Sequence, residues 1–175
     1  IAICLKKNIP IRLPVLYQNL GTLYNKDSPD TARYYLNKAK EISITLNDLH
    51  ALAYSTYNIA ELDADAGNYK EAKQGMEKAM NIFNRINESS NTGWVIPRIV
   101  QLELKQLEQN NSGISKIKYE ELKVSLDKAL ALNANGNNYE TLESIYDSYI
   151  RLGKLNNKYK FASSYQDTLL RLKDT

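Results

Sequence analysis

The stretch AGNYKEAKQGMEKA, residues 66–79, places a glycine and an asparagine before a segment in which alanine recurs after seven residues. Ala72 and Ala79 are two helical turns apart, so they lie on one face of a helix, and Met76 lies between them on that face. The distance between two packed helices depends on the side chains at their contact, and small side chains allow a close approach. The stretch therefore predicts a closely packed pair of helices.

The same pattern recurs along the chain at a spacing of 39–40 residues. A repeat of this length indicates stacked supersecondary units, each of which buries its apolar face only against its neighbours. The first two units match at four pairs of positions: Gly21 with Ala60, Ala32 with Ala72, Leu36 with Met76, and Ala39 with Ala79. A third unit has the pattern at Leu122, Leu126 and Ala129. A fourth unit has it at Tyr146, Tyr149 and Gly153.

Each unit has helical periodicity, and no segment alternates for long enough to form a strand. The predicted helices cover residues 12–25, 29–46, 49–66, 69–86, 95–109, 117–133, 138–152 and 155–172. Asp27-Ser28-Pro29 and Ala66-Gly67-Asn68 are the expected breaks within pairs, with Pro29 in a first helical turn and Gly67 at positive φ. Asn47-Asp48, Ser89-Ser90-Asn91 and residues 133–138 are the expected separators between units.

This arrangement of small and bulky residues resembles the tetratricopeptide repeat. The second unit matches best, through Ile59-Ala60, Gly67-Asn68-Tyr69 and the Ala72–Met76–Ala79 stripe, and it departs at Asp63, where a tyrosine is expected. The third unit lacks the small residue in its first helix, and the fourth has Lys158 where a small residue is expected. The resemblance implies an all-α, right-handed superhelical solenoid of antiparallel helix pairs, with about four units of roughly 40 residues.

The predicted domain organisation is a single array over residues 1–175. It comprises the end of a preceding repeat at 1–8, repeat 1 at 11–46, repeat 2 at 49–87, a divergent repeat 3 at 94–133 and repeat 4 at 138–173. Ile1, Ile3 and Leu5 align with the close of a second helix, so we expect them to continue a larger array or to be covered by a neighbouring chain. Self-association through this N-terminal end is therefore possible.

The resemblance implies a module that binds a protein or peptide. The long period and the closing LLRLKDT look like the arrays at the front of bacterial signalling proteins, where a kinase or a helix-turn-helix output follows. We therefore expect the sensing or docking part of a larger signal-transduction or transcription-regulatory protein, periplasmic if that protein spans a membrane and otherwise cytoplasmic. A structural or oligomerising scaffold is the alternative, and nucleic-acid binding is a third possibility.

The resemblance also points to residues of a peptide groove. In tetratricopeptide arrays an asparagine two residues before the Gly/Ala position often reaches the backbone of the bound peptide, and Asn19 and Asn58 have that position. Four acids against two bases on the groove face favour a basic or polar peptide; alternatively, the two asparagines only satisfy neighbouring backbone groups. The groove candidates are Val15, Asn19, Thr22 and Lys26; Tyr54, Asn58, Glu61 and Asp65; and Glu140, Ser144, Asp147 and Arg151.

Catalytic and cofactor chemistry finds no support in the sequence. There is one histidine, His50, and one cysteine, Cys4, and no phosphate-binding glycine loop or CxxC motif is present. We therefore expect no enzyme, no catalytic or metal site and no cofactor. A net charge of +3 from interspersed 23 basic and 20 acidic residues argues against nucleic acid, and no apolar run is long enough to span a membrane. Most of the thirteen tyrosines occupy packing positions, and Trp94 is expected to anchor the start of the third unit.

Overall fold

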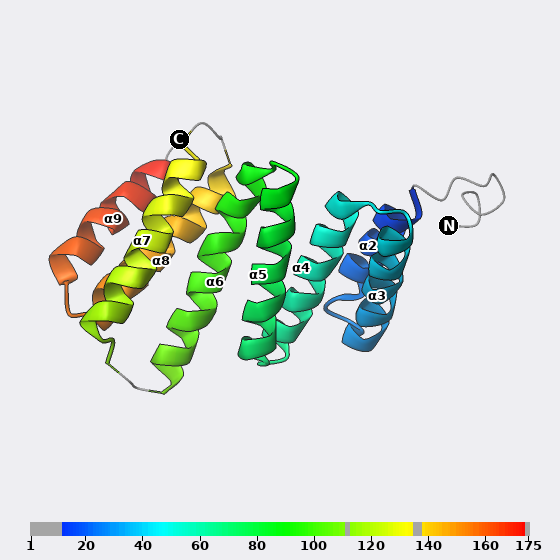
Figure 1. Cartoon of the computed structure of the whole chain (residues 1–175). Coiled ribbons are helices and arrows are strands. Elements are labelled where there is room, and N and C mark those ends of the chain that lie inside the picture. The colour runs from blue at the N-terminus through cyan, green and yellow to red at the C-terminus, as the bar shows by residue number, and fades with distance from the viewer. Residues whose placement is uncertain (1–11, 111–112, 135–137, 174–175) are drawn as a thin grey trace. The chain divides into compact units, whose positions relative to one another are not determined.

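The computed structural model describes residues 12–110, 113–134 and 138–173, and the regular structure in these ranges is helical throughout (Figure 1). This confirms the predicted all-α class built from helix pairs. By its internal contacts the chain divides into two compact units, Ile1–Glu88 and Ser89–Thr175. The helices are α2 (Leu13–Tyr24), α3 (Pro29–Thr45), α4 (Leu49–Asp65) and α5 (Tyr69–Arg85) in the first unit, and α6 (Ser89–Gln109), α7 (Lys116–Leu132), α8 (Tyr139–Leu155) and α9 (Tyr159–Lys173) in the second.

In the first unit, α3 packs against both α2 and α4, and Leu36 is at the centre of both contacts. On one side a Cβ atom added to Gly21 would lie 2.5 Å from the Leu36 Cγ, so α2 approaches α3 more closely than any larger residue allows. On the other side Leu36 and Ala32 form a buried cluster with Leu62 of α4. The glycine and alanine positions of the repeat are thus the points of closest helix approach.

The contact between α4 and α5 explains the alanine spacing of residues 66–79. Ala72, Met76 and Ala79 are completely buried, as the pattern predicts. A Cβ atom on Gly75 would lie 2.7 Å from the Cβ of Ala60, which shows how closely the two helices approach. Alanine recurs after seven residues because this one face of α5 is the packing face.

A common turn ends α3, α4, α5 and α8. The first residue of this turn has positive φ. It is Asn47 (φ 52°) after α3, Gly67 (81°) after α4, Asn87 (60°) after α5 and Asn157 (54°) after α8. The backbone N–H of the residue that follows donates to the carbonyl five positions earlier, for example Asp48 to Ser43 and Asn68 to Asp63. This is the Schellman arrangement, which favours glycine and asparagine. The predicted positive φ at Gly67 and the predicted Pro29 in the first turn of α3 are both confirmed.

Two sequence expectations in the second unit are wrong. Ser89-Ser90-Asn91 does not separate two units but is the first turn of α6, because Asn87 and Glu88 already close α5. In the fourth repeat α8 continues to Leu155, and the small residue that meets it is Ala162 instead of Lys158. A Cβ atom on Gly153 would lie 3.1 Å from the Ala162 Cβ, so Gly153 is a contact inside a helix and not a helix end. The third-unit stripe of Leu122, Leu126 and Ala129 is buried, as predicted.

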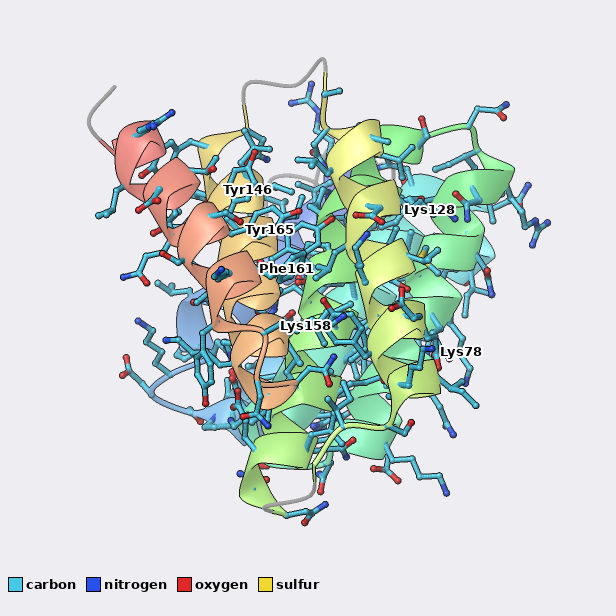
Figure 2. All side chains as sticks on the ribbon, turned by 90° about the vertical axis from the view of Figure 1, so that its left-hand side faces the viewer. Lys78, Lys128, Tyr146, Lys158, Phe161 and Tyr165 are labelled. Carbon is cyan, nitrogen blue, oxygen red and sulfur yellow. The ribbon has the colours of Figure 1, made fainter. Side chains whose placement is uncertain are left out.

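Aromatic side chains fill the space between the helices of the second unit. Tyr149 of α8 stacks on Tyr165 of α9, with ring centroids 4.2 Å apart, and Phe161 meets both rings edge-on. Figure 2 shows Tyr146, Tyr165 and Phe161 together between α8 and α9, with Lys158 beside them. The Lys158 ammonium lies 4.1 Å from the centre of the Tyr119 ring. Packing therefore accounts for these tyrosines. Ile1, Ile3, Cys4 and Leu5 lie outside the described residues.

Candidate functional site

In the first unit, the two first helices α2 and α4 are joined by a buried glutamine. Gln18 Nε2 donates to the Ala51 carbonyl at 2.7 Å and to Ser55 Oγ at 2.8 Å. This bridge fixes the spacing between the two helices that carry seven of the groove candidates, with Lys26 in the turn after α2. Sequence reasoning missed it, because a glutamine in an amphipathic helix has the pattern of a solvent-exposed residue.

The predicted stripe on α2 is exposed over its whole length. Val15 is 49% exposed, and Asn19, Thr22 and Lys26 are exposed as well. Lys26 lies in the turn after α2, and the Thr22 hydroxyl donates back to the Gln18 carbonyl at 3.1 Å. Beside this stripe, Asn19 also lines an apolar hollow of about 350 Å³ with Leu16, Leu20 and Leu23.

The predicted stripe on α4 is held largely by neighbouring side chains. The Tyr54 ring packs against His50 and against Phe83 of α5, with centroids 4.8 Å and 5.1 Å away. Glu61 accepts a hydrogen bond from the Tyr57 hydroxyl, and Asp65 Oδ2 accepts one from Asn25 Nδ2 at 3.5 Å.

Asn58, the remaining member of the α4 stripe, is half-buried in the middle of the helix. Within the described ranges, neither the side-chain amide of Asn58 nor that of Asn19 makes a hydrogen bond. In the part of the chain that the structure describes, no hydrogen bond therefore ties either asparagine side chain to neighbouring backbone.

In the second unit, a cleft of about 480 Å³ lies between the two first helices α6 and α8. The structure brings Glu140, Ser144 and Asp147 together there, as the groove interpretation requires. Sequence reasoning missed Arg98, Gln101 and Leu169, because they come from helices whose adjacency to α8 is a tertiary property, and it missed Glu143 of α8, which lies beside the predicted stripe. The lining consists of Arg98, Gln101, Glu140, Glu143, Ser144, Asp147 and Leu169.

A short hydrogen-bonded chain crosses the floor of this cleft. Arg98 Nη1 donates to Gln101 Oε1 at 2.8 Å, and Gln101 Nε2 donates to Ser144 Oγ at 2.8 Å. The chain orients the amide of Gln101 and links α6 to α8 across 43 positions of sequence. The cleft wall therefore has its polar groups in defined orientations.

Arg151, the fourth candidate on α8, does not line the cleft. Its guanidinium donates to both carboxylate oxygens of Glu108 on α6, at 3.0 Å and 2.7 Å, and lies 3.9 Å from Asp147. The hydrogen bond with Glu108 raises the pKa of Arg151. Because Glu108 neutralises Arg151, the cleft itself has three carboxylates, from Glu140, Glu143 and Asp147, against the single guanidinium of Arg98.

Neither a metal site nor a membrane segment emerges from the described part of the chain. Within it, no group of three or more histidine, cysteine or acidic side chains is arranged to hold a metal ion. None of its helices is both long and apolar enough to cross a bilayer. Trp94 is held by a hydrogen bond from its Nε1 to Asn91 Oδ1 at 3.0 Å, near the start of α6.

Comparison with known proteins adds a structural neighbour. No model of a known protein family matches the chain, and no curated protein matches it. The crystal structure of BtubC (BKLC) from P. vanneervenii is similar in fold, with a TM-score of 0.76 and 17% sequence identity. The match covers 94% of this chain and 65% of BtubC, so this chain spans less than two thirds of its neighbour. At this identity the likeness shows the fold alone.

Proposed function

We propose that the chain binds extended segments of a partner protein along the outer faces of its first helices, α2 and α4 in one unit and α6 and α8 in the other. The observation that carries this proposal is the polar cleft between α6 and α8. It is open to solvent, it is lined from α6, α8 and Leu169 of α9, and its polar groups are oriented by the Arg98–Gln101–Ser144 chain. Such a surface offers hydrogen bonds at fixed positions, which suits recognition of an extended chain.

The chemistry of the two faces favours a basic or polar ligand. The cleft of the second unit places Glu140, Glu143 and Asp147 opposite only one cation, Arg98. In the first unit, the amides of Asn19 and Asn58 each offer a donor and an acceptor, which matches a peptide group. Lysine or arginine side chains of the ligand would pair with the carboxylates, while the asparagines would bind its backbone.

The first experiment measures binding of a peptide library, biased to lysine and arginine, to the full chain. For any peptide selected, the double variant Asn19→Ala with Asn58→Ala is expected to lose about 0.5–1.5 kcal/mol of binding free energy per hydrogen bond. Asn37→Ala is the matched control, because Asn37 is an exposed asparagine on the second helix α3. Equal affinity of the double variant and the control would exclude the asparagine role.

The second experiment tests the cleft of the second unit. Glu140→Lys reverses one exposed charge on its rim, so it is expected to weaken binding of a basic peptide and to reduce the salt dependence of that binding. Lys160→Glu is a control that changes charge at an exposed position outside the cleft. Affinity changes of similar size and opposite sign in the two variants would indicate a net-charge effect and no site, because the two substitutions change the net charge in opposite directions.

The wider role that we propose is docking or sensing within a larger bacterial regulatory protein. It rests on the resemblance of the repeats to signalling arrays, and it requires a kinase, a DNA-binding or another output domain in the same polypeptide. A parent polypeptide without any output domain would refute this role. A structural or oligomerising scaffold is the alternative. It would be favoured if the chain self-associates in analytical ultracentrifugation and selects no peptide.

A further inference from the structure

The apolar hollow on α2 adjoins the stripe of groove candidates, because Asn19 of that stripe lines the hollow as well. Leu16, Leu20 and Leu23 line it, and Leu23 is 69% exposed. A leucine this exposed, next to two others, forms an apolar surface without a partner among the described residues. The question is what kind of chain covers it.

The first unit itself contains the covered form of the same surface. Leu20 and Leu23 precede Ile59 and Leu62 by 39 residues each, so the two pairs are equivalent in the repeat. In α4, Leu62 is only 4% exposed, because it packs with Ala32 and Leu36 of α3, and Ile59 packs against the same cluster. The position that is buried beneath a preceding second helix in α4 is therefore open in α2.

We propose that the Leu16–Leu20–Leu23 face of α2 is a docking site for an amphipathic helix of a partner protein, a helix that presents a small residue and a leucine four residues apart. This is the spacing of Ala32 and Leu36, which seal the equivalent face of α4. The leucine would lie between Leu20 and Leu23, and the small residue would allow the helix to approach closely. The site borders the α2 stripe at Asn19 and shares no residue with the cleft between α6 and α8, so it would add a second, helix-specific interaction.

A difference between α2 and α4 indicates which residue the partner helix should have at a further position. At the contact of α3 with α4, Arg33 Nη2 lies 2.7 Å from Asp63 Oδ1. The residue of α2 equivalent to Asp63 is Tyr24, which has no charge to pair with an arginine. The partner helix should therefore have an apolar residue or a hydrogen-bond acceptor where α3 has Arg33.

The test uses the full chain and a synthetic peptide with the sequence of residues 28–46. In this peptide alanine replaces Arg33, and a lactam bridge between the exposed positions 37 and 41 stabilises the helix. Fluorescence anisotropy is expected to show saturable binding. Leu23→Asp on the chain, or Leu36→Asp in the peptide, should weaken it about tenfold or more, because either change buries an unpaired carboxylate. Leu170→Asp is the matched control: Leu170 is also an exposed leucine, 55% exposed, on α9. It should leave the affinity unchanged.

Several results would overturn the proposal. Absence of binding up to about 1 mM peptide would do so, as would equal affinity of the Leu23→Asp and Leu170→Asp chains. A dimer that Leu23→Asp dissociates would identify a second copy of the chain as the occupant. An affinity that rises on deletion of residues 1–11 would identify this segment of the chain as the occupant. None of these results depends on whether the cleft between α6 and α8 binds a ligand.

Discussion

Removing the hydroxyl group of Tyr149 should destabilise the second unit in a manner that depends on pH. The Tyr149 hydroxyl donates to Asp127 Oδ1 at 2.6 Å and so ties α8 to α7, while Lys123 donates to Oδ2 of the same carboxylate at 2.8 Å. Tyr149→Phe deletes only this bond, because the ring and its stack on Tyr165 are kept. The change therefore measures one hydrogen bond to a charged acceptor.

The magnitude follows from the surroundings of the two groups. A hydrogen bond to a charged group contributes roughly 1.5–3 kcal/mol when its loss leaves a partner buried and unsatisfied. The Asp127 side chain is 48% exposed and keeps its bond to Lys123, so water can replace the lost donor. We therefore expect Tyr149→Phe to lower the free energy of unfolding at neutral pH by about 1–1.5 kcal/mol, at or just below the lower limit of that range.

The pH dependence has a definite sign. Burial raises the pKa of Tyr149, and Asp127 raises it further, so the hydroxyl remains a donor at neutral and acidic pH. Burial opposes ionisation of Asp127, but the hydrogen bonds from Lys123 and Tyr149 outweigh it and lower the pKa of this carboxyl group. A lowered carboxyl pKa contributes stability that is complete above the unfolded-state value of about 3.9 and is lost as the pH falls through the folded value. The difference between the wild-type chain and Tyr149→Phe should therefore shrink below about pH 4.

Urea unfolding followed by circular dichroism, repeated from about pH 7 to about pH 3, measures this difference. Tyr146→Phe is the matched control, because Tyr146 lies on the same helix and its hydroxyl makes no hydrogen bond within the described ranges. Equal stability of the two variants at neutral pH would refute the expected contribution of the Tyr149–Asp127 hydrogen bond to the free energy of unfolding. A Tyr149→Phe effect that stays constant down to about pH 3 would refute the role of the ionised carboxylate.

Three further changes test the packing and the turns. Ala72→Leu and Ala79→Leu overpack the fully buried face of α5, so each should cost about 1–3 kcal/mol in urea unfolding; an unchanged midpoint for both would exclude the close α4–α5 contact. Gly67→Ala places a Cβ at φ 81° and should cost about 1–2 kcal/mol, while Gly67→Asn should cost less; equal costs would show that the left-handed conformation is not the cause. Arg151→Ala breaks the partly exposed pair with Glu108 and should cost about 0.5–1 kcal/mol, with a smaller effect at high salt; salt independence would contradict a mainly ionic contribution.

Much of the fold could be predicted from the sequence, because the signals that define it are local. Helical periodicity, the alanine spacing around Ala72 and the positive φ of Gly67 depend on residues within a few positions of each other. The first-unit helices accordingly begin and end close to their predicted positions. The errors arose where a local signal has two meanings. Serine and asparagine at 89–91 suit a turn but here begin α6, and Gly153 suits a helix end but here allows close contact with Ala162.

The candidate site could be predicted only in part. The sequence by itself determined which faces of α2, α4 and α8 are polar, because helix geometry assigns each residue to a face. The tertiary structure alone decided that Gln101 meets Ser144, that Glu108 neutralises Arg151 and that Gln18 joins α2 to α4. These pairs are 33 to 43 residues apart, and within each unit they form only because the two first helices pack side by side at a particular spacing. That spacing is set by the sizes of all the side chains between the helices acting together, and no single stretch of the sequence contains it.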